Sequence, residues 1–381
     1  MVQGKLVSDE KKIVTYLIND LGKGGAEMML YQLLKYRTDL SIEYRVISLG
    51  GEDYYKKLIQ DLSISVTTLD IKKHPVSSLF RLRRLLYGID AISCWMYNSN
   101  LIGYIVGKTI KVNRVIWNVR HSDLKPEHNK RSTLLINWLC AKLSGKVSFI
   151  AYNGEKAREV HEEAGYCRCK GIVVENGVDI DDYAYHLEGR KIIESELTIA
   201  QGKKIVLSVS RYAPIKDVAT FIKTVSILHK AMPEIVAVIC GKGITDTNES
   251  IVADCESNGL VVGKDIHLLG LRHDVRTLMS ACDIFILHST GEAFPNTLVQ
   301  AMSCGCLCIS TDVGDARTIL GNSSFISEPA NPVSLSKVAL NALSLNEEET
   351  NKVRVENRKR VCDYYDIKSI VQQYEDIIKR V

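Results

Sequence analysis

The chain has 381 residues, of which 46% are apolar and 25% are charged, and its formal net charge is +4. This composition is that of a soluble globular protein, the length favours two domains, and the mild charge gives no support to nucleic-acid binding. No apolar run reaches the roughly 18–20 residues of a membrane span. The first residues, MVQGKLVSDEKK, also lack the apolar core of a signal peptide, so we expect a cytoplasmic protein.

Strand-like and helix-like segments alternate through the first part of the chain. Strands are predicted at residues 12–18, 44–49, 65–70, 91–96, 114–119, 147–152 and 171–177. Helices are predicted at residues 26–36, 76–87 and 132–143. Because alternating strands and helices build parallel sheets, this order predicts a doubly wound α/β domain.

The pattern then breaks and starts again. Residues 179–203 are polar and lack strand character, which predicts a domain boundary. Strands follow at 204–210, 235–241, 265–270, 283–289 and 307–312, with helices at 218–229, 251–258, 275–281 and from Asn296, and a helical tail over 332–380. We therefore expect two Rossmann-like domains facing across a cleft, residues 1–183 and 184–363, with a C-terminal helix at about 364–381 that can pack back on the first. Ligands of such sheets bind at the carboxyl ends of the strands, so the loops that follow strands should hold the chemistry.

Residues 291–305, GEAFPNTLVQAMSCG, place a carboxylate beside a helix start. Glu292 lies in a turn rich in Gly, Pro and Asn, and the helical pattern begins at Asn296 or Thr297 and ends at Gly305. A helix N-terminus offers unpaired N–H groups and a partial positive charge, which suits a phosphate. A carboxylate next to a phosphate cradle is what a nucleotide-sugar needs.

Two further strand ends carry basic side chains. The segment SRYAPIKD (210–217) holds Arg211 and Lys216 across a turn that contains proline, and this pair indicates an anion. Arg120 and His121 follow the strand 114–119, where a histidine could donate to a reacting group or orient it. The structural alternatives are two solvated surface charges and an ordinary structural histidine.

One glycine turn follows the first predicted strand of the first domain, and another follows the second predicted strand of the second domain. GKGGAE (22–27) and GKG (241–243) allow a ligand to approach the backbone closely. The first is not the GxGxxG pattern of dinucleotide-binding folds, and its structural alternative is a tight strand–helix turn.

Taken in order, these segments resemble a known family. GKGGAE, His121, VVENGVD (173–179), SRYAPIKD, CGKG (240–243), HLLGLRHDVRTLMSACDIFILHS (267–289), GEAFPNTLVQAMSCG and TDVGDA (311–316) are similar to the retaining GT-B glycosyltransferases of family 4, of the bacterial surface-polysaccharide and O-antigen type. The resemblance implies an acceptor-binding first domain and a second domain that binds a nucleotide-sugar, with UDP-sugars ahead of GDP-sugars. It also implies transfer, with retained anomeric configuration, to a glycan or a polyprenyl-diphosphate-linked acceptor.

The resemblance assigns roles by position. Arg211 and Lys216 would bind the donor diphosphate, Glu292 the sugar hydroxyls, and His121 would lie near the sugar C6 hydroxyl or the acceptor. The other donor-site positions that it implies are Gly24, Gly25, Arg120, Asn176, Gly241, Gly243, Ala293, Phe294, Pro295, Asn296, Thr297 and Gln300.

One position departs from the family pattern. The family has a second carboxylate eight residues after the first, for the ribose hydroxyls, and this chain has Gln300 there. The amide oxygen still accepts one hydrogen bond, but without charge assistance, at a cost of about 1 kcal/mol of donor affinity.

Neither a cofactor nor a metal is expected. No DxD motif stands in a strand-end loop, and Arg211, Lys216 and helix N-termini would stabilise the departing diphosphate in place of a metal. The alternatives that stay open are a sugar-nucleotide epimerase on the same fold, a nicotinamide-dependent oxidoreductase, and a non-catalytic partner subunit that binds a nucleotide-sugar.

A basic cluster precedes and enters the helix predicted at 76–87. It comprises Lys72, Lys73, Arg81, Arg83 and Arg84, interleaved with leucines and a phenylalanine. Two interpretations stay open: an ordinary amphipathic helix with a solvated face, and a peripheral contact with the anionic inner face of the cytoplasmic membrane.

Overall fold

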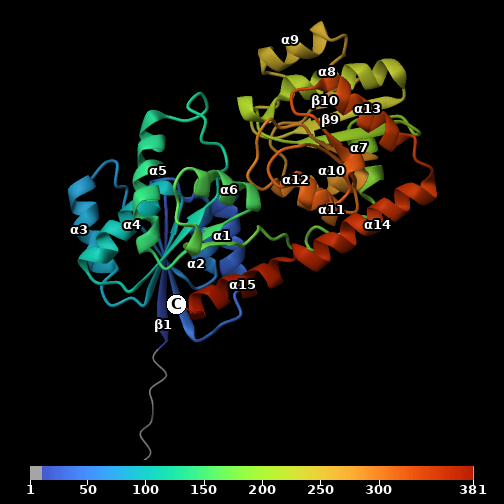
Figure 1. The fold of residues 1–381 in the computed structure, drawn as a ribbon. Helices are drawn as coiled ribbons and strands as arrows, with labels where there is room; N and C mark the ends of the chain where they lie inside the picture. Colours follow the sequence, from blue (N-terminus) through green and yellow to red (C-terminus); the bar gives the residue numbers. More distant parts are fainter. Residues whose placement is uncertain (1–10, 381) are drawn as a thin grey trace, which may run out of the picture. The chain divides into compact units, whose positions relative to one another are not determined.

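The computed structural model describes residues 11–380, which form two compact units (Figure 1). Unit 1 runs to Gly177 and resumes at Ile367, and unit 2 is Val178–Asp366. These boundaries lie a few residues from the expected 183/184 and 363/364. The difference arises because the segment after Gly177 is bonded into unit 2: the Val178 N–H donates to the Tyr365 carbonyl over 2.8 Å, and Arg358 donates to the Ile180 carbonyl over 2.8 Å.

Unit 1 is built on a parallel sheet of seven strands in the order β3-β2-β1-β4-β5-β6-β7. The strands are β1 (Lys12–Ile18), β2 (Ile42–Ser48), β3 (Ser65–Thr68), β4 (Ala91–Trp95), β5 (Arg114–Val119), β6 (Phe149–Tyr152) and β7 (Gly171–Val173). The helices are α1 (Gly25–Lys35), α2 (Tyr54–Asp61), α3 (Pro75–Leu85), α4 (Tyr97–Thr109), α5 (Arg131–Leu143), α6 (Glu155–Glu163) and α15 (Ile367–Arg380). Strands β4 and β5 are buried almost throughout, as the central strands of a sheet covered on both faces must be.

The C-terminal helix α15 packs on unit 1 beside α1 (Figure 1). Its apolar stripe, which includes Ile370, Tyr374 and Ile377, is buried in the same hydrophobic cluster as strand β1. The buried Glu375 carboxylate accepts hydrogen bonds from the N–H groups of Thr38 (2.7 Å) and Asp39 (3.0 Å). Apolar burial and these charge-assisted hydrogen bonds together fix the end of the chain to the first sheet.

Unit 2 repeats the design with six parallel strands in the order β10-β9-β8-β11-β12-β13. The strands are β8 (Lys204–Val209), β9 (Ile235–Cys240), β10 (Ile266–Leu268), β11 (Ile284–Leu287), β12 (Leu307–Thr311) and β13 (Ile326–Ser327). The helices are α7 (Gly189–Glu196), α8 (Val218–Ala231), α9 (Glu249–Ser257), α10 (Val275–Ala281), α11 (Asn296–Ser303), α12 (Ala316–Leu320), α13 (Pro332–Leu343) and α14 (Glu347–Tyr364).

The α/β class and the two doubly wound, Rossmann-like sheets are confirmed. Differences are local: the strand predicted at 171–177 ends at Val173, and the segment 179–203, predicted as a domain boundary without strand character, contains α7. Helix α7 is amphipathic and buries Ile193, but it has only eight residues, a length at which the pattern is easily overlooked. No helix within residues 11–380 is long and apolar enough to cross a membrane.

Candidate functional site

Lys216 and Glu292 meet at the carboxyl ends of strands β8 and β11. The Lys216 ammonium forms an ion pair with Glu292 Oε1, and the side chains are only 20% and 12% exposed. The hydroxyl of Ser289 donates to the same carboxylate oxygen over 2.7 Å. The structure thus brings together the lysine predicted for a diphosphate and the carboxylate predicted for sugar hydroxyls.

Hydrogen bonds between the two loops, and from the end of β12, hold this pair in place. The Thr290 N–H donates to the Ile215 carbonyl over 2.9 Å, and the Thr311 hydroxyl donates to the Ser289 carbonyl over 2.7 Å. Gly314 packs against the backbone of the Glu292 turn and has φ of +53°. A Cβ at this position would lie 2.6 Å from the Glu292 carbonyl oxygen. A side chain is therefore excluded at Gly314 by both backbone conformation and space, which explains the glycine in TDVGDA.

His288 lies beneath the Lys216 loop and was missed by the sequence reasoning. It is fully buried at the end of β11, its Nε2 lies 2.8 Å from the Ser208 hydroxyl, and its ring packs on Phe221 at 5.0 Å. Burial lowers its pKa to about 4, so the imidazole is neutral at physiological pH. The available signal was a lone polar residue within the apolar run DIFILHS.

Arg211 follows β8 and is exposed to solvent. Its loop is joined to the glycine turn after β9, because the Tyr212 N–H donates to the Lys242 carbonyl over 2.8 Å. A Cβ at Gly241 would lie 2.0 Å from the Ser210 carbonyl oxygen. Gly241 therefore lets two strand-end loops pack together, and Gly243, with φ of +82°, completes the turn. A direct ligand contact for either glycine stays a prediction.

Helix α11 begins at Asn296 behind the Glu292 turn, with Pro295 as its N-cap residue. Phe294 is buried and packs on Tyr365 with ring centroids 5.7 Å apart, so its side chain anchors the turn. Gln300, which stands where the family has a carboxylate for the ribose hydroxyls, lies on the same helix and is 8% exposed. Of the other donor-site positions predicted in this segment, Ala293, Asn296 and Thr297 are half-buried.

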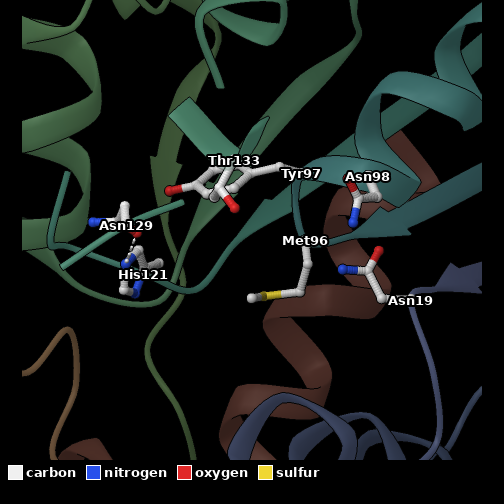
Figure 2. Close-up of a pocket in the computed structure, with 7 residues that line it drawn as sticks. All are labelled: Asn19, Met96, Tyr97, Asn98, His121, Asn129 and Thr133. Carbon is white, nitrogen blue, oxygen red and sulfur yellow. Dashed lines mark hydrogen bonds between the residues drawn. The ribbon is translucent and has the colours of Figure 1, made fainter. Parts of the chain in front are cut away.

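Unit 1 has its own pocket, where His121 lies (Figure 2). It has a volume of about 250 Å³ and is lined by Asn19, Met96, Tyr97, Asn98, His121, Asn129 and Thr133. Figure 2 shows Asn19 and Asn98 on one side and the hydrogen-bonded His121 and Asn129 on the other. Among residues 11–380, no lysine, arginine, aspartate or glutamate lines this pocket.

Neighbouring groups fix the orientation of the polar side chains in the pocket. Asn19 Oδ1 accepts hydrogen bonds from the Ser99 N–H (3.1 Å) and hydroxyl (2.8 Å), which leaves its Nδ2 as a donor. Asn129 Nδ2 donates to the Asp123 carbonyl over 2.7 Å, so Asn129 Oδ1 accepts from His121 Nε2 over 3.3 Å. The His121 Nδ1 then has a lone pair to offer whenever the ring is neutral.

The residues around this pocket have two further features, a buried hydrogen-bonded pair and a strained backbone conformation. The Tyr97 hydroxyl donates to His161 Nε2 over 2.6 Å, while His161 Nδ1 donates to the Ala157 carbonyl, and burial lowers the pKa of His161 to about 4. Met96, between β4 and α4, has φ of +72° and ψ of 160°, a conformation that costs a non-glycine residue about 1–3 kcal/mol. Backbone strain of this kind, at a residue that lines a pocket, is typical of a functional site.

Arg120 and Asn176 are bonded to each other within unit 1. The Arg120 guanidinium donates to Asn176 Oδ1 and to the Tyr374 hydroxyl, and lies 3.9 Å from the centroid of the Trp95 ring. Burial lowers the pKa of this guanidinium. The structure thus gives Arg120 a role in attaching helix α15, while ligand binding by Arg120 and Asn176 stays a prediction.

The first glycine turn is lined by carboxylates. Gly24 is the N-cap residue of α1 and Gly25 its first residue, and a Cβ at Gly24 would lie 2.1 Å from Glu27 Oε2. A Cβ at Gly22 would lie 2.0 Å from Glu52 Oε2. A phosphate that approached this loop would therefore meet negative charge, and its contact with Gly24 and Gly25 stays a prediction.

The two units, each a doubly wound sheet with functional groups at its strand ends, define the GT-B class of fold. Residues 23–182 match the family model "Glycosyltransferase Family 4", and residues 189–360 match "Glycosyl transferases group 1". The chain therefore carries these two glycosyltransferase domains.

Curated relatives are similar at low identity. Over 93% of this chain and 94% of the relative, the chain is 25% identical to N,N'-diacetylbacillosaminyl-diphospho-undecaprenol alpha-1,3-N-acetylgalactosaminyltransferase of Campylobacter jejuni. It is 24% identical to UDP-Gal:alpha-D-GlcNAc-diphosphoundecaprenol alpha-1,3-galactosyltransferase of Escherichia coli, over 65% of this chain and 64% of that enzyme.

Solved structures share the fold. Anabaena HepE in complex with UDP and glucose superposes with a TM-score of 0.84 at 20% identity, over 97% of this chain and 100% of that one. Sucrose-phosphate synthase of Thermosynechococcus elongatus superposes with a TM-score of 0.80 at 13% identity, over 97% of this chain and 99% of that one.

Proposed function

We propose that this protein is a retaining glycosyltransferase that moves a sugar from a nucleotide-sugar, with UDP-sugars favoured, to an acceptor linked to polyprenyl diphosphate. The observation that carries the proposal is the pairing of Lys216 with Glu292 at adjoining strand ends of unit 2. The relatives named above support the acceptor class, and HepE with UDP supports the nucleotide. The pathway that we propose is the synthesis of a bacterial surface polysaccharide, in the cytoplasm at the membrane.

In this proposal, unit 2 stabilises the leaving group. As the bond between the sugar and the diphosphate breaks, negative charge grows on the phosphate oxygens. Lys216, held in its loop above His288, and Arg211, at the end of β8, would offset that charge. Glu292 would accept hydrogen bonds from the sugar hydroxyls and orient the ring, so these groups supply position and charge without a metal.

The unit 1 pocket would hold a neutral part of the acceptor. Its fixed donors and acceptors, the Asn19 amide and the His121 ring among them, match hydroxyl groups. The volume of about 250 Å³ equals about eight waters at roughly 30 Å³ each, which is room for one sugar ring. With an α-configured donor, retention would give the α linkage that both relatives' names specify.

One experiment tests the proposal against its alternatives. Purified protein is incubated with UDP-, GDP- and dTDP-sugars and a lipid-linked acceptor, with and without EDTA and with and without NAD. Nucleotide release, product linkage, isomerisation and binding of the sugar-nucleotide, and NADH formation are measured. We expect nucleotide release that depends on the acceptor, an α-linked product and no effect of EDTA. Isomerised sugar-nucleotide would indicate an epimerase, hydride transfer to NAD an oxidoreductase, and binding without turnover a non-catalytic subunit. Loss of turnover with EDTA would contradict the metal-free mechanism.

A further inference from the structure

Helices α3, α4 and α5 of unit 1 lie side by side, since α4 packs against both of its neighbours (Figure 1). All three helices lack aspartate and glutamate altogether. The segment around them, residues 71–154, contains 14 Lys or Arg and three Asp or Glu, a net charge of +11 in a chain whose total is +4. The rest of the chain therefore carries −7, and the positive charge is concentrated around these helices.

The exposed side of α3 is apolar as well as basic. Val76 is 67% exposed and Phe80 is 69% exposed, one helical turn apart, and Tyr87 just after the helix is 78% exposed. The exposed Arg83 and Arg84 lie between Phe80 and Tyr87 in the sequence and on the same side by helical spacing. An ordinary amphipathic helix turns polar residues to water, so large exposed apolar side chains here are the reverse of the expected pattern.

Helix α5 shows the same combination at helical spacing. Arg131, Leu135, Trp138 and Lys142 are all exposed, and their spacing places them along one side of the helix. Leu135 is 58% exposed and Trp138 is 53% exposed, and the Lys142 ammonium lies 5.8 Å from the centroid of the Trp138 ring. Helix α4 adds Ile105, which is 51% exposed, and Lys108 one turn further on.

We propose that the exposed side of α3, α4 and α5, here called the docking surface, binds an anionic phospholipid bilayer. Exposed aromatic and aliphatic side chains flanked by basic groups are the composition that binds at the interface of an anionic membrane. A second copy of this chain fits less well, because it would bring like charges together. The inference rests on the proposed function for its purpose, since a polyprenyl-linked acceptor is held in a bilayer.

Vesicle flotation tests the charge part of the inference. The full chain should float with vesicles of phosphatidylcholine and phosphatidylglycerol, and poorly with phosphatidylcholine alone or at high salt. The triple variant Arg81→Gln, Arg83→Gln, Arg84→Gln should bind roughly a hundredfold more weakly, at about fivefold for each basic side chain. The matched control, which removes three exposed lysines from unit 2, should bind like the unaltered chain: Lys223→Gln, Lys337→Gln, Lys352→Gln.

Tryptophan fluorescence tests the apolar part of the inference. Of the three tryptophans, Trp95 and Trp117 are buried, so quenching of fluorescence by brominated phosphatidylglycerol reports on Trp138. Trp138 should be quenched and its emission shifted to the blue. The double variant Phe80→Ser, Trp138→Ser should bind at least about tenfold more weakly. The control double variant Val333→Ser, Val355→Ser, at exposed sites of unit 2, should not change binding.

Several outcomes would overturn the inference. They are equal binding to neutral and anionic vesicles, an unquenched Trp138, and a dimer that dissociates when Trp138 is replaced while no vesicle binding is seen. If flotation fails but sugar transfer in detergent proceeds, the docking surface is wrong and the proposed function stands. If flotation succeeds but no sugar is transferred, the proposed function is wrong and the docking surface stands.

Discussion

Replacing Lys216 by methionine should affect both the stability of unit 2 and turnover. Methionine keeps most of the side-chain volume but leaves the Glu292 carboxylate, which is 12% exposed, without its cation. Glu292 keeps the hydrogen bond from Ser289, so we expect a loss of about 1–3 kcal/mol of unfolding free energy, below the 3–5 kcal/mol of a fully buried pair. For a unit of this size, the melting temperature should fall by about 2–4 °C per kcal/mol.

Turnover should fall much further than stability. Removal of one group that stabilises charge in a transition state costs about 10²–10³ in kcat, and Lys216 is assigned that role at the leaving diphosphate. The assay measures nucleotide release with saturating acceptor, at a temperature where both proteins are folded. Lys223→Met, at an exposed position of α8, is the matched control and should leave both quantities unchanged.

A double variant separates the two effects of Lys216. Lys216→Met combined with Glu292→Gln removes both charges. The double variant should therefore lose less unfolding free energy than the two single variants lose together, while its turnover stays low. The reasoning would be refuted if Lys216→Met melted like the unaltered chain and turned over within a few-fold of it.

Three further predictions concern buried groups. Because burial lowers the pKa of His161 and of His288 to about 4 from an ordinary 6.5, their contribution to stability is complete above pH 6.5 and is lost as the pH falls toward 4. Urea midpoints should show a loss of roughly 2 kcal/mol per histidine between pH 7 and pH 5, and His161→Gln should abolish its share. Gln300→Glu should tighten donor binding up to about tenfold by calorimetry, while the buried carboxylate lowers the melting temperature; unchanged affinity would contradict a ribose contact. Arg120→Met should cost about 2–4 kcal/mol of stability, because the Asn176 and Tyr374 groups lose their donor, and should speed proteolysis near α15.

The fold was predictable because its signals are local and repeated. Apolar runs such as residues 204–210 and 235–241 became β8 and β9, and each ends in the turn that the glycines and polar residues marked. The short helices α2 and α7 were missed because each has only eight residues and buries very few side chains, so tertiary packing decides whether such a segment is helical. The boundary near Gly177 was placed late because the bond between Val178 and Tyr365 joins residues far apart in sequence.

The site was predictable by residue type but not by partner. Strand ends with Arg211, Lys216 and Glu292 could be found from spacing, since parallel strands bring their carboxyl ends to one edge. The ion pair between Lys216 and Glu292 could not, because it depends on the packing of two loops 76 residues apart. His288 was missed for a related reason: its role is to fill the space beneath a loop.

The ion pair makes opposite predictions for two ligands at the same site. In the structure Glu292 is paired with Lys216. Under the proposed function, a diphosphate would compete with Glu292 for the lysine, and a sugar would use the carboxylate that this competition releases. Glu292→Gln should therefore strengthen binding of UDP alone, by about fivefold for 1 kcal/mol, because Lys216 loses its competitor. The same variant should weaken binding of the UDP-sugar relative to UDP, because a neutral amide accepts weaker hydrogen bonds from hydroxyls. Calorimetry with both ligands checks this, and equal weakening of both would show that the pair holds the site together and does not compete with the donor.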